Sequence, residues 1–310
     1  MDFLKKIKIP DFLLKQEPSI GLDIGSSSLK LIVLEKRGKE KILKSFFYSE
    51  LTPGSPIGNS FSNFLKSKKL EGRRVNISVS GQSVVTRYLS WPKMTLAELK
   101  NTMQFEAKEY IPFPLEEVVL DCAIIKDNFE SDKMLVVLAA IKKTILQERL
   151  GLLEKEGLVP KLIDVDCFCL ANIFNKSCFA LDASVREKTI ALLNIGAQTT
   201  NMAIIDSGAL RFSRDISFGV KGLALAGLSA EITTSIDYYE NQNGRPVEKL
   251  LVSGGGSYSQ DTLNFLNHQL NLPVDSFDTL SGVAVDQNLN LEEFKPKKNL
   301  FTVALGLALR

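Results

Sequence analysis

Two short segments of the chain repeat one another, and each predicts a β-hairpin with a glycine at its bend. They are residues 20–34, IGLDIGSSSLKLIVL, and residues 190–205, IALLNIGAQTTNMAII. Aliphatic runs bounded by Gly and Ser are typical of buried strands. When the two copies are aligned, Asp23 corresponds to Asn194, Gly25 to Gly196 and Ser28 to Thr199.

Hairpins of this kind can hold an anion differently from the common nucleotide-binding loops. Dinucleotide and P-loop motifs lead from a strand into a helix whose N-terminus holds the phosphate. Here a strand follows each loop, so the N–H groups of the turn would hold the anion, and glycine permits its close approach. One such turn is common. Two copies in separate halves predict two similar lobes that grip one phosphate chain.

Length and composition agree with this interpretation. The 310 residues suffice for two lobes of ordinary size. A net charge of +2 gives no broad field for a nucleic-acid partner, so none is expected. The longest apolar stretch, residues 134–141, is far shorter than the ~18 residues that span a bilayer. Lysines and Pro10 interrupt any signal-peptide core near the start, so we expect a cytoplasmic protein.

Cysteine and histidine usage argues against several kinds of site. Cys122, Cys167, Cys169 and Cys178 lack paired CxxC spacing, which favours buried, inert thiols over a metal site or disulfide. His268 is the only histidine, and its surroundings predict the exposed face of an amphipathic helix. Histidine-dependent triads and histidine-ligated zinc are therefore not expected.

The first 18 residues form a basic amphipathic segment. Bulky apolar residues alternate with lysines, so residues 1–15 are suited to peripheral contact with an anionic membrane surface. A frayed or locally packed tail is the alternative.

Residues 84–156 predict a separate βαββα unit between the strands at 74–80 and 161–166. Its strands are expected at 84–89, 118–126 and 133–140, and its second helix at 143–156. Its first helix should begin with a capping box, in which Thr95 and Glu98 satisfy free N–H groups.

Two further features lie near the end of the chain. Three glycines, Gly254, Gly255 and Gly256, follow a predicted strand and precede a helix at 261–270. They predict a place where the backbone approaches a ligand, with a flexible turn as the alternative. Residues 300–310 predict an apolar helix rich in small residues, which suits close packing.

Together these motifs resemble those of actin-like ATPases and, within them, the PilM proteins of type IV pilus assembly, which are related to FtsA. Residues 21–30 resemble the first phosphate motif, residues 194–200 the second and residues 253–257 the adenosine motif. Residues 163–166 and 304–310 correspond to the two connecting segments. Residues 89–118 resemble the insert that replaces the small lobe-one subdomain of actin, which distinguishes the chain from sugar kinases and chaperones.

The resemblance implies a two-lobed actin-like, ribonuclease H-like α/β fold. Residues 1–18 would be the N-terminal segment, 19–185 lobe one with the insert at about 84–160, 186–299 lobe two, and 300–310 a helix returning to lobe one. It also implies ATP and Mg²⁺ as cofactors, with Asp23 facing Mg²⁺ through water. The implied cofactor-binding residues are Asp23, Gly25, Ser26, Ser27, Ser28, Lys30, Gly196, Ala197, Gln198, Thr199, Gly254, Gly255 and Gly256. Asp23, Asn194 and Asp166 are candidates for a catalytic role.

Two departures from the family pattern argue against turnover. Asn194 stands where the second motif usually has Asp, and an amide lacks the charge that holds Mg²⁺ or orients a water. Only residues 220–231 precede the predicted helix of lobe two, so most of the outer subdomain that closes over the base is missing.

The resulting hypothesis is a cytoplasmic scaffold of a type IV pilus or related secretion machine. The family implies binding of the cytoplasmic tail of a PilN-like inner-membrane protein between lobe one and the insert, with other machine components as further partners. The retained Asp23 and the three glycines favour ATP binding as a possible function, whereas hydrolysis is expected to be weak or absent. The alternatives are a working ATPase and an FtsA-like, self-associating filament protein tethered to the membrane.

Overall fold

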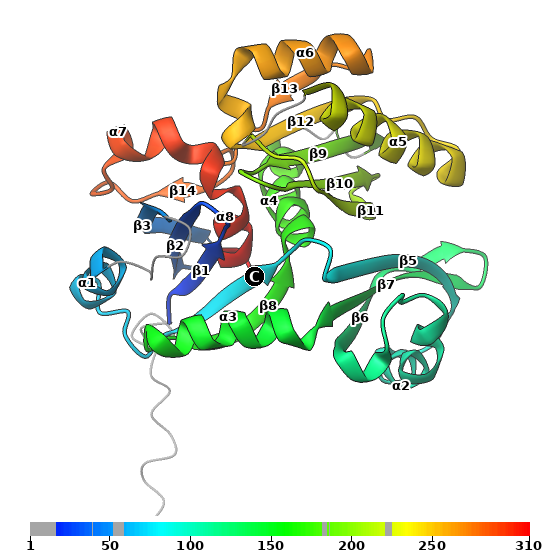
Figure 1. The fold of residues 1–310 in the computed structure, drawn as a ribbon, viewed down its shortest axis with the longest axis horizontal. Helices are drawn as coiled ribbons and strands as arrows, with labels where there is room; N and C mark the ends of the chain where they lie inside the picture. Colours follow the sequence, from blue (N-terminus) through cyan, green and yellow to red (C-terminus); the bar gives the residue numbers. More distant parts are fainter. Residues whose placement is uncertain (1–16, 39, 52–58, 182–184, 186, 221–224) are drawn as a thin grey trace, which may run out of the picture.

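The computed structural model describes residues 17–38, 40–51, 59–181, 185, 187–220 and 225–310, with backbone alone for 178–181. Figure 1 shows two lobes, each built on its own sheet, with two helices between them and a third, smaller sheet to one side. The predicted N-terminal segment, up to residue 16, lies outside the described residues.

The first lobe is built on a six-stranded sheet of order β14-β3-β2-β1-β4-β8. The pairs β1–β2 and β2–β3 are antiparallel, whereas β1–β4, β4–β8 and β14–β3 are parallel. The strands are β1 (Ser19–Ile24), β2 (Ser28–Arg37), β3 (Glu40–Glu50), β4 (Arg74–Val79), β8 (Val159–Val165) and β14 (Ala284–Val285). One face packs against α1 (Asn59–Ser67) and α3 (Lys143–Lys155) through Phe61, Leu65 and Leu153.

The second lobe is built on a five-stranded sheet of order β11-β10-β9-β12-β13. Its strands are β9 (Thr189–Ile195), β10 (Thr200–Asp206), β11 (Ala209–Ile216), β12 (Lys249–Gly254) and β13 (Val274–Ser276). α5 (Leu225–Asn243) and α6 (Gln260–Leu270) pack on one face through Leu228, Ile232, Tyr239 and Leu266. The predicted hairpins are confirmed, since β1 pairs with β2 and β9 with β10, both antiparallel.

The helices α4 (Asp166–Leu181) and α8 (Thr302–Ala308) lie between the two sheets. They share one apolar core with β2 of the first lobe and with β9 and β10 of the second. Gly306 allows them to touch, because a Cβ built there would lie 2.2 Å from the carbonyl oxygen of Cys169. The small residues predicted at the end of the chain therefore serve close packing.

Part of the predicted βαββα unit forms a three-stranded sheet covered by one helix, which we call the insert. The predicted second helix, α3, packs instead on the sheet of the first lobe. The strand order of the insert is β5-β7-β6, with β5 (Val84–Pro92), β6 (Val118–Glu130), β7 (Lys133–Lys142) and α2 (Leu96–Glu106). The insert has its own core, in which Leu99 and Met103 of α2 meet Val136 and Leu138 of β7. The capping box is confirmed: the Thr95 hydroxyl accepts from the Glu98 N–H, and the Glu98 carboxylate accepts from the Thr95 N–H at 2.8 Å.

The chain returns to lobe one before the predicted residue 300. β14 pairs with β3, and α7 (Leu291–Phe294) follows, then a 3₁₀ helix at Lys295–Phe301. Phe46 of β3 stacks edge-on against Phe294 and Phe301, with ring centroids 4.8 and 5.6 Å apart. The predicted end of lobe two at residue 299 is therefore wrong, because the two-residue strand β14 is too short to leave a periodic signal in the sequence.

The described residues contain no helix long and apolar enough to cross a membrane. Residues 217–224 alone join β11 to α5, because α5 begins at Leu225, within the segment 220–231 that was predicted to precede this helix.

Candidate functional site

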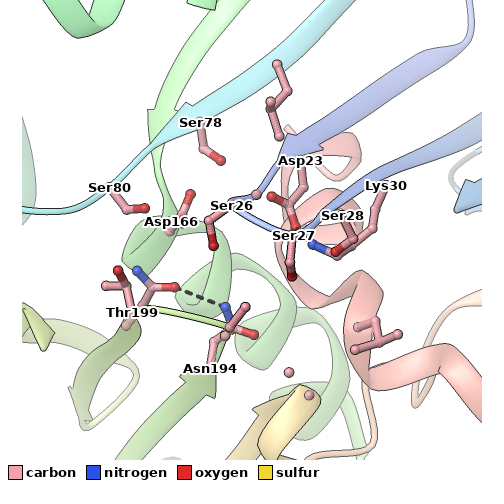
Figure 2. Close-up of a pocket in the computed structure, with 18 of the residues that line it drawn as sticks. Asp23, Ser26, Ser27, Ser28, Lys30, Ser78, Ser80, Asp166, Asn194 and Thr199 are labelled. Atoms are coloured by element: carbon pink, nitrogen blue, oxygen red, sulfur yellow. Dashed lines mark hydrogen bonds and ion pairs between the residues drawn. The ribbon is translucent and has the colours of Figure 1, made fainter. Parts of the chain in front are cut away.

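A cleft of about 360 Å³ lies between the two lobes, and both predicted turns open into it. Figure 2 shows Asp23, Ser26, Ser27, Ser28 and Lys30 on one side. Asn194 and Thr199 of the second lobe lie opposite them, with Asp166, Ser78 and Ser80 also facing the cleft. The predicted site residues from both halves of the chain are therefore neighbours in space.

The two turns have the same geometry. In each, the glycine N–H donates to the carbonyl oxygen three residues later, from Gly25 to Ser28 and from Gly196 to Thr199, both at 3.0 Å. A Cβ at Gly196 would lie 2.8 Å from the Thr199 carbonyl oxygen, so only glycine fits this bend. Because both turns face one cleft, their backbone groups can approach a single anion from opposite sides.

The third glycine segment contributes two residues to the cleft. Gly254 has a φ of +76°, and a Cβ there would lie 2.6 Å from the Ile195 carbonyl oxygen. Gly254 and Gly255 line the cleft. Gly256 does not, because it is buried against the side chain of Ile195. Gln198 does not line it either, since its side chain is exposed at the tip of the second turn.

Asp23 and Lys30 form a buried ion pair beside the first turn. The Lys30 Nζ lies 2.8 Å from Asp23 Oδ2, and the two side chains are only 11% and 12% exposed. β1–β2 pairing places them directly opposite one another. Lys30 is therefore already neutralised by Asp23, and both groups lie at the edge of the predicted phosphate site.

Asp166, the first residue of α4, lines this cleft with a carboxyl whose pKa is strongly raised. Burial, together with the negative charges of Asp23 and Asp215, raises its pKa to about 6. Hydrogen bonds from Ser78 and Ser80 work in the opposite direction, since they stabilise the charged form. A carboxyl that lies in a cleft although burial and nearby negative charges disfavour its ionised form is typical of a functional site.

Asn194 is fixed in place by a chain of hydrogen bonds. Its Nδ2 donates to Asn201 Oδ1 at 3.0 Å, and Asn201 Nδ2 donates to Asp215 Oδ1 at 2.8 Å. Asp215 Oδ2 also accepts from the Gly81 N–H, at the start of the insert. On its other side, Asn194 Oδ1 lies 3.5 Å from the Ser253 hydroxyl, which donates to it, so both ends of the amide are held by neighbours.

Several residues that line the cleft were not predicted: Tyr48, Ser78, Ser80, Arg149, Asn201, Val220 and Leu300. Most are isolated polar residues that enter from other elements, and they belong to no local motif. Ser78 and Ser80 could have been predicted, because they lie at the end of the predicted strand 74–80, which pairs with β1 in the sheet.

Comparison with known proteins agrees with this fold. A family model described as "Type IV pilus assembly protein PilM" matches residues 21–226, more than half of the chain. A chain of the PilM–PilN type IV pilus biogenesis complex matches with 25% identity and a TM-score of 0.79, over 94% of this chain and 98% of that one. A protein of unknown function from Bacteroides thetaiotaomicron, described as having an actin-like ATPase fold, matches with 11% identity and a TM-score of 0.52, over 87% of this chain and 95% of that one.

These matches confirm the actin-like fold predicted from the two phosphate-type hairpins, and the family predicted from them and from the insert. The chain belongs to the PilM family of type IV pilus assembly proteins.

Proposed function

We propose that this protein is a cytoplasmic scaffold of a type IV pilus or related secretion machine, and that it binds the cytoplasmic tail of a PilN-like inner-membrane protein. The observation that carries the proposal is the near full-length likeness to a chain of the PilM–PilN complex. Association with the inner membrane would then come through this partner. Since fold alone does not fix function, the proposal needs a binding surface on this chain.

The tail is proposed to bind between lobe one and the insert. β8 is an edge strand of the first sheet, and it lies on the side that faces the insert (Figure 1). Its apolar residues Val159 and Leu162 are 46% and 37% exposed. Across from it, β6 is an edge strand of the insert and exposes Val119 at 40%. An exposed edge with apolar side chains suits an extended peptide that adds a strand.

A binding titration tests this proposal. A synthetic peptide of the partner's cytoplasmic tail is expected to bind the purified protein, and Leu162→Asp should weaken binding about tenfold, because it puts a charge where an apolar contact is needed. Tyr238→Asp is the matched control, since Tyr238 is an exposed aromatic residue of the other lobe. Absence of binding by the unaltered protein would contradict the proposal. An equal loss in both variants would contradict the proposed surface.

We also propose that the cleft binds ATP with Mg²⁺ as a conformational ligand. The two glycine turns suit a phosphate chain, because both line one cleft and bring their backbone N–H groups to it from opposite lobes. Asp23 and Asp166 supply carboxylate oxygens, which Mg²⁺ prefers. Within the described part of the chain no cluster of three or more potential ligands could hold a metal by itself. Bound Mg²⁺ would thus depend on phosphate and water ligands and would neutralise charge between nucleotide and carboxylates.

Hydrolysis is proposed to be weak or absent. Asn194 carries no charge, and its amide N–H group is already committed to Asn201. A working ATPase remains the second candidate because Asp166 has a pKa near the range in which a carboxyl can exchange protons at neutral pH. The measurement is phosphate release under saturating Mg-ATP: a rate at background favours the scaffold, and a robust rate abolished by Asp166→Asn favours the enzyme.

The FtsA-like alternative depends on residues 1–15, which lie outside the described residues. Co-sedimentation with anionic liposomes, compared with a variant that lacks this segment, distinguishes it from binding through a partner alone.

A further inference from the structure

Arg149 lies at the nucleotide cleft but belongs to neither phosphate hairpin. It is a half-buried residue of α3, and its side chain lines the cleft. Its Nη1 donates to the carbonyl oxygen of Ile24 at 2.7 Å. Ile24 is the last residue of β1 and immediately precedes the first turn. The guanidinium is therefore held directly beside the predicted phosphate-binding backbone.

Arg149 differs from Lys30, the other cation that lines the cleft, in that its charge is not paired within the described part of the chain. Lys30 is paired with Asp23, whereas Arg149 takes part in no ion pair among the described residues. A guanidinium has five N–H donors in a planar fork, and the contact with Ile24 uses one of them. Because this fork matches phosphate oxygens in pairs, an arginine held in this way is suited to a phosphate group.

The position of Arg149 indicates which phosphate it would meet. Gly254 and Gly255, on the lobe-two side of the cleft, mark the end proposed for the nucleoside. Arg149 and the Gly25–Ser28 turn lie on the lobe-one side. A nucleotide whose nucleoside lies beside Gly254 and Gly255 would hold its phosphate chain between the two hairpin turns, and the guanidinium beside the first turn would meet the terminal phosphate, which carries the most negative charge.

We propose that Arg149 binds the terminal phosphate of ATP and so makes the protein distinguish ATP from ADP. This inference rests on the proposed nucleotide function. It also suggests how nucleotide binding would be transmitted to the insert, because α3 begins at the residue directly after β7 of the insert and also contacts β8. A shift of Arg149 on loss of the terminal phosphate would move the helix that joins the insert to lobe one.

Calorimetric titration with Mg-ATP and with Mg-ADP tests the inference. Arg149→Met should weaken Mg-ATP binding about tenfold or more, the loss expected for a charge-assisted hydrogen-bonded contact, and should leave Mg-ADP binding within about twofold. Arg149→Lys, which keeps the charge but not the fork, should give an intermediate loss for ATP alone. Lys155→Met is the matched control, since it removes an exposed cation from the same helix and should change neither affinity.

The outcomes separate this inference from the function beneath it. If the unaltered protein binds neither nucleotide at millimolar concentration, the proposed nucleotide site is wrong and the inference falls with it. If the unaltered protein binds ATP but Arg149→Met leaves both affinities unchanged or weakens both equally, only the inference is overturned. An equal loss would mean that Arg149 merely supports the shape of the first turn.

Discussion

Replacing Asp166 by asparagine should stabilise the ligand-free protein at neutral pH. The pKa of this carboxyl rises from 3.8 to about 6 in the folded state, chiefly through burial and then through the charge of Asp23. The folded state therefore binds the proton more than a hundredfold more tightly than the unfolded chain, which at pH 7 corresponds to roughly 3 kcal/mol of lost stability. Asparagine is uncharged and removes that cost, less what it loses in hydrogen bonding to Ser78 and Ser80, so we expect a gain of about 2 kcal/mol.

The sign of the effect fixes its pH dependence. Because the folded pKa lies above the unfolded one, the loss is absent below about pH 4, grows between pH 4 and 6, and is complete above pH 6. The variant should therefore melt several degrees higher than the unaltered protein at pH 7, and the difference should vanish near pH 4.

Thermal unfolding without nucleotide at a series of pH values measures this. Asp164→Asn is the matched control from two residues away. Asp164 Oδ2 accepts a 2.6 Å hydrogen bond from Arg310 Nε, so removal of its charge should lower stability at pH 7. A melting temperature of Asp166→Asn equal to or below that of the unaltered protein at pH 7 would refute the reasoning, as would a gain of the same size at pH 4.

Three further predictions follow from the same structure. Gly306→Ala should destabilise the protein by roughly 1–3 kcal/mol, because a methyl group there meets the Cys169 carbonyl oxygen. Gly151→Ala, which has open space around it in α3, should stabilise the protein by about 0.5–1 kcal/mol. Denaturant unfolding compares the two variants. Burial raises the pKa of the Cys167 thiol well above its usual range, so mass spectrometry should find it unmodified after brief iodoacetamide treatment of the native protein at pH 7.5, and rapid modification would contradict its burial. Asp215→Ala should weaken nucleotide binding although Asp215 does not line the cleft, because Asn201 and then Asn194 lose their orientation; titration with Mg-ATP checks this, and an unchanged affinity would show that the hydrogen-bond chain is dispensable.

The sequence was sufficient for features that depend on local pattern. The two hairpins were predictable because each is a short continuous segment that contains both of its strands and the glycine of its bend. The same holds for the helix that starts after Thr95, whose capping box needs residues only three positions apart. Family resemblance then placed the two hairpins in one cleft.

Features that depend on distant residues were not predictable from pattern. Arg149 reaches Ile24 across 125 positions of sequence, and Asp215 reaches Gly81 across 134. Each is a single polar residue in an element whose periodicity is set by core packing, so no local signal marks its role. The early return of the chain to lobe one was missed for a related reason, since β14 has only two residues and is held by its pairing with β3.

The central claim is that the two hairpins form a working nucleotide clamp. Calorimetric titration of nucleotide-stripped protein with Mg-ATP tests this, with Asp23→Asn as the variant, because that change keeps a hydrogen-bond acceptor for Lys30 and removes the charge proposed to face Mg²⁺. We expect micromolar binding by the unaltered protein and a loss of about tenfold or more in the variant. No binding at millimolar Mg-ATP would contradict it and would leave the fold as a protein-binding platform alone.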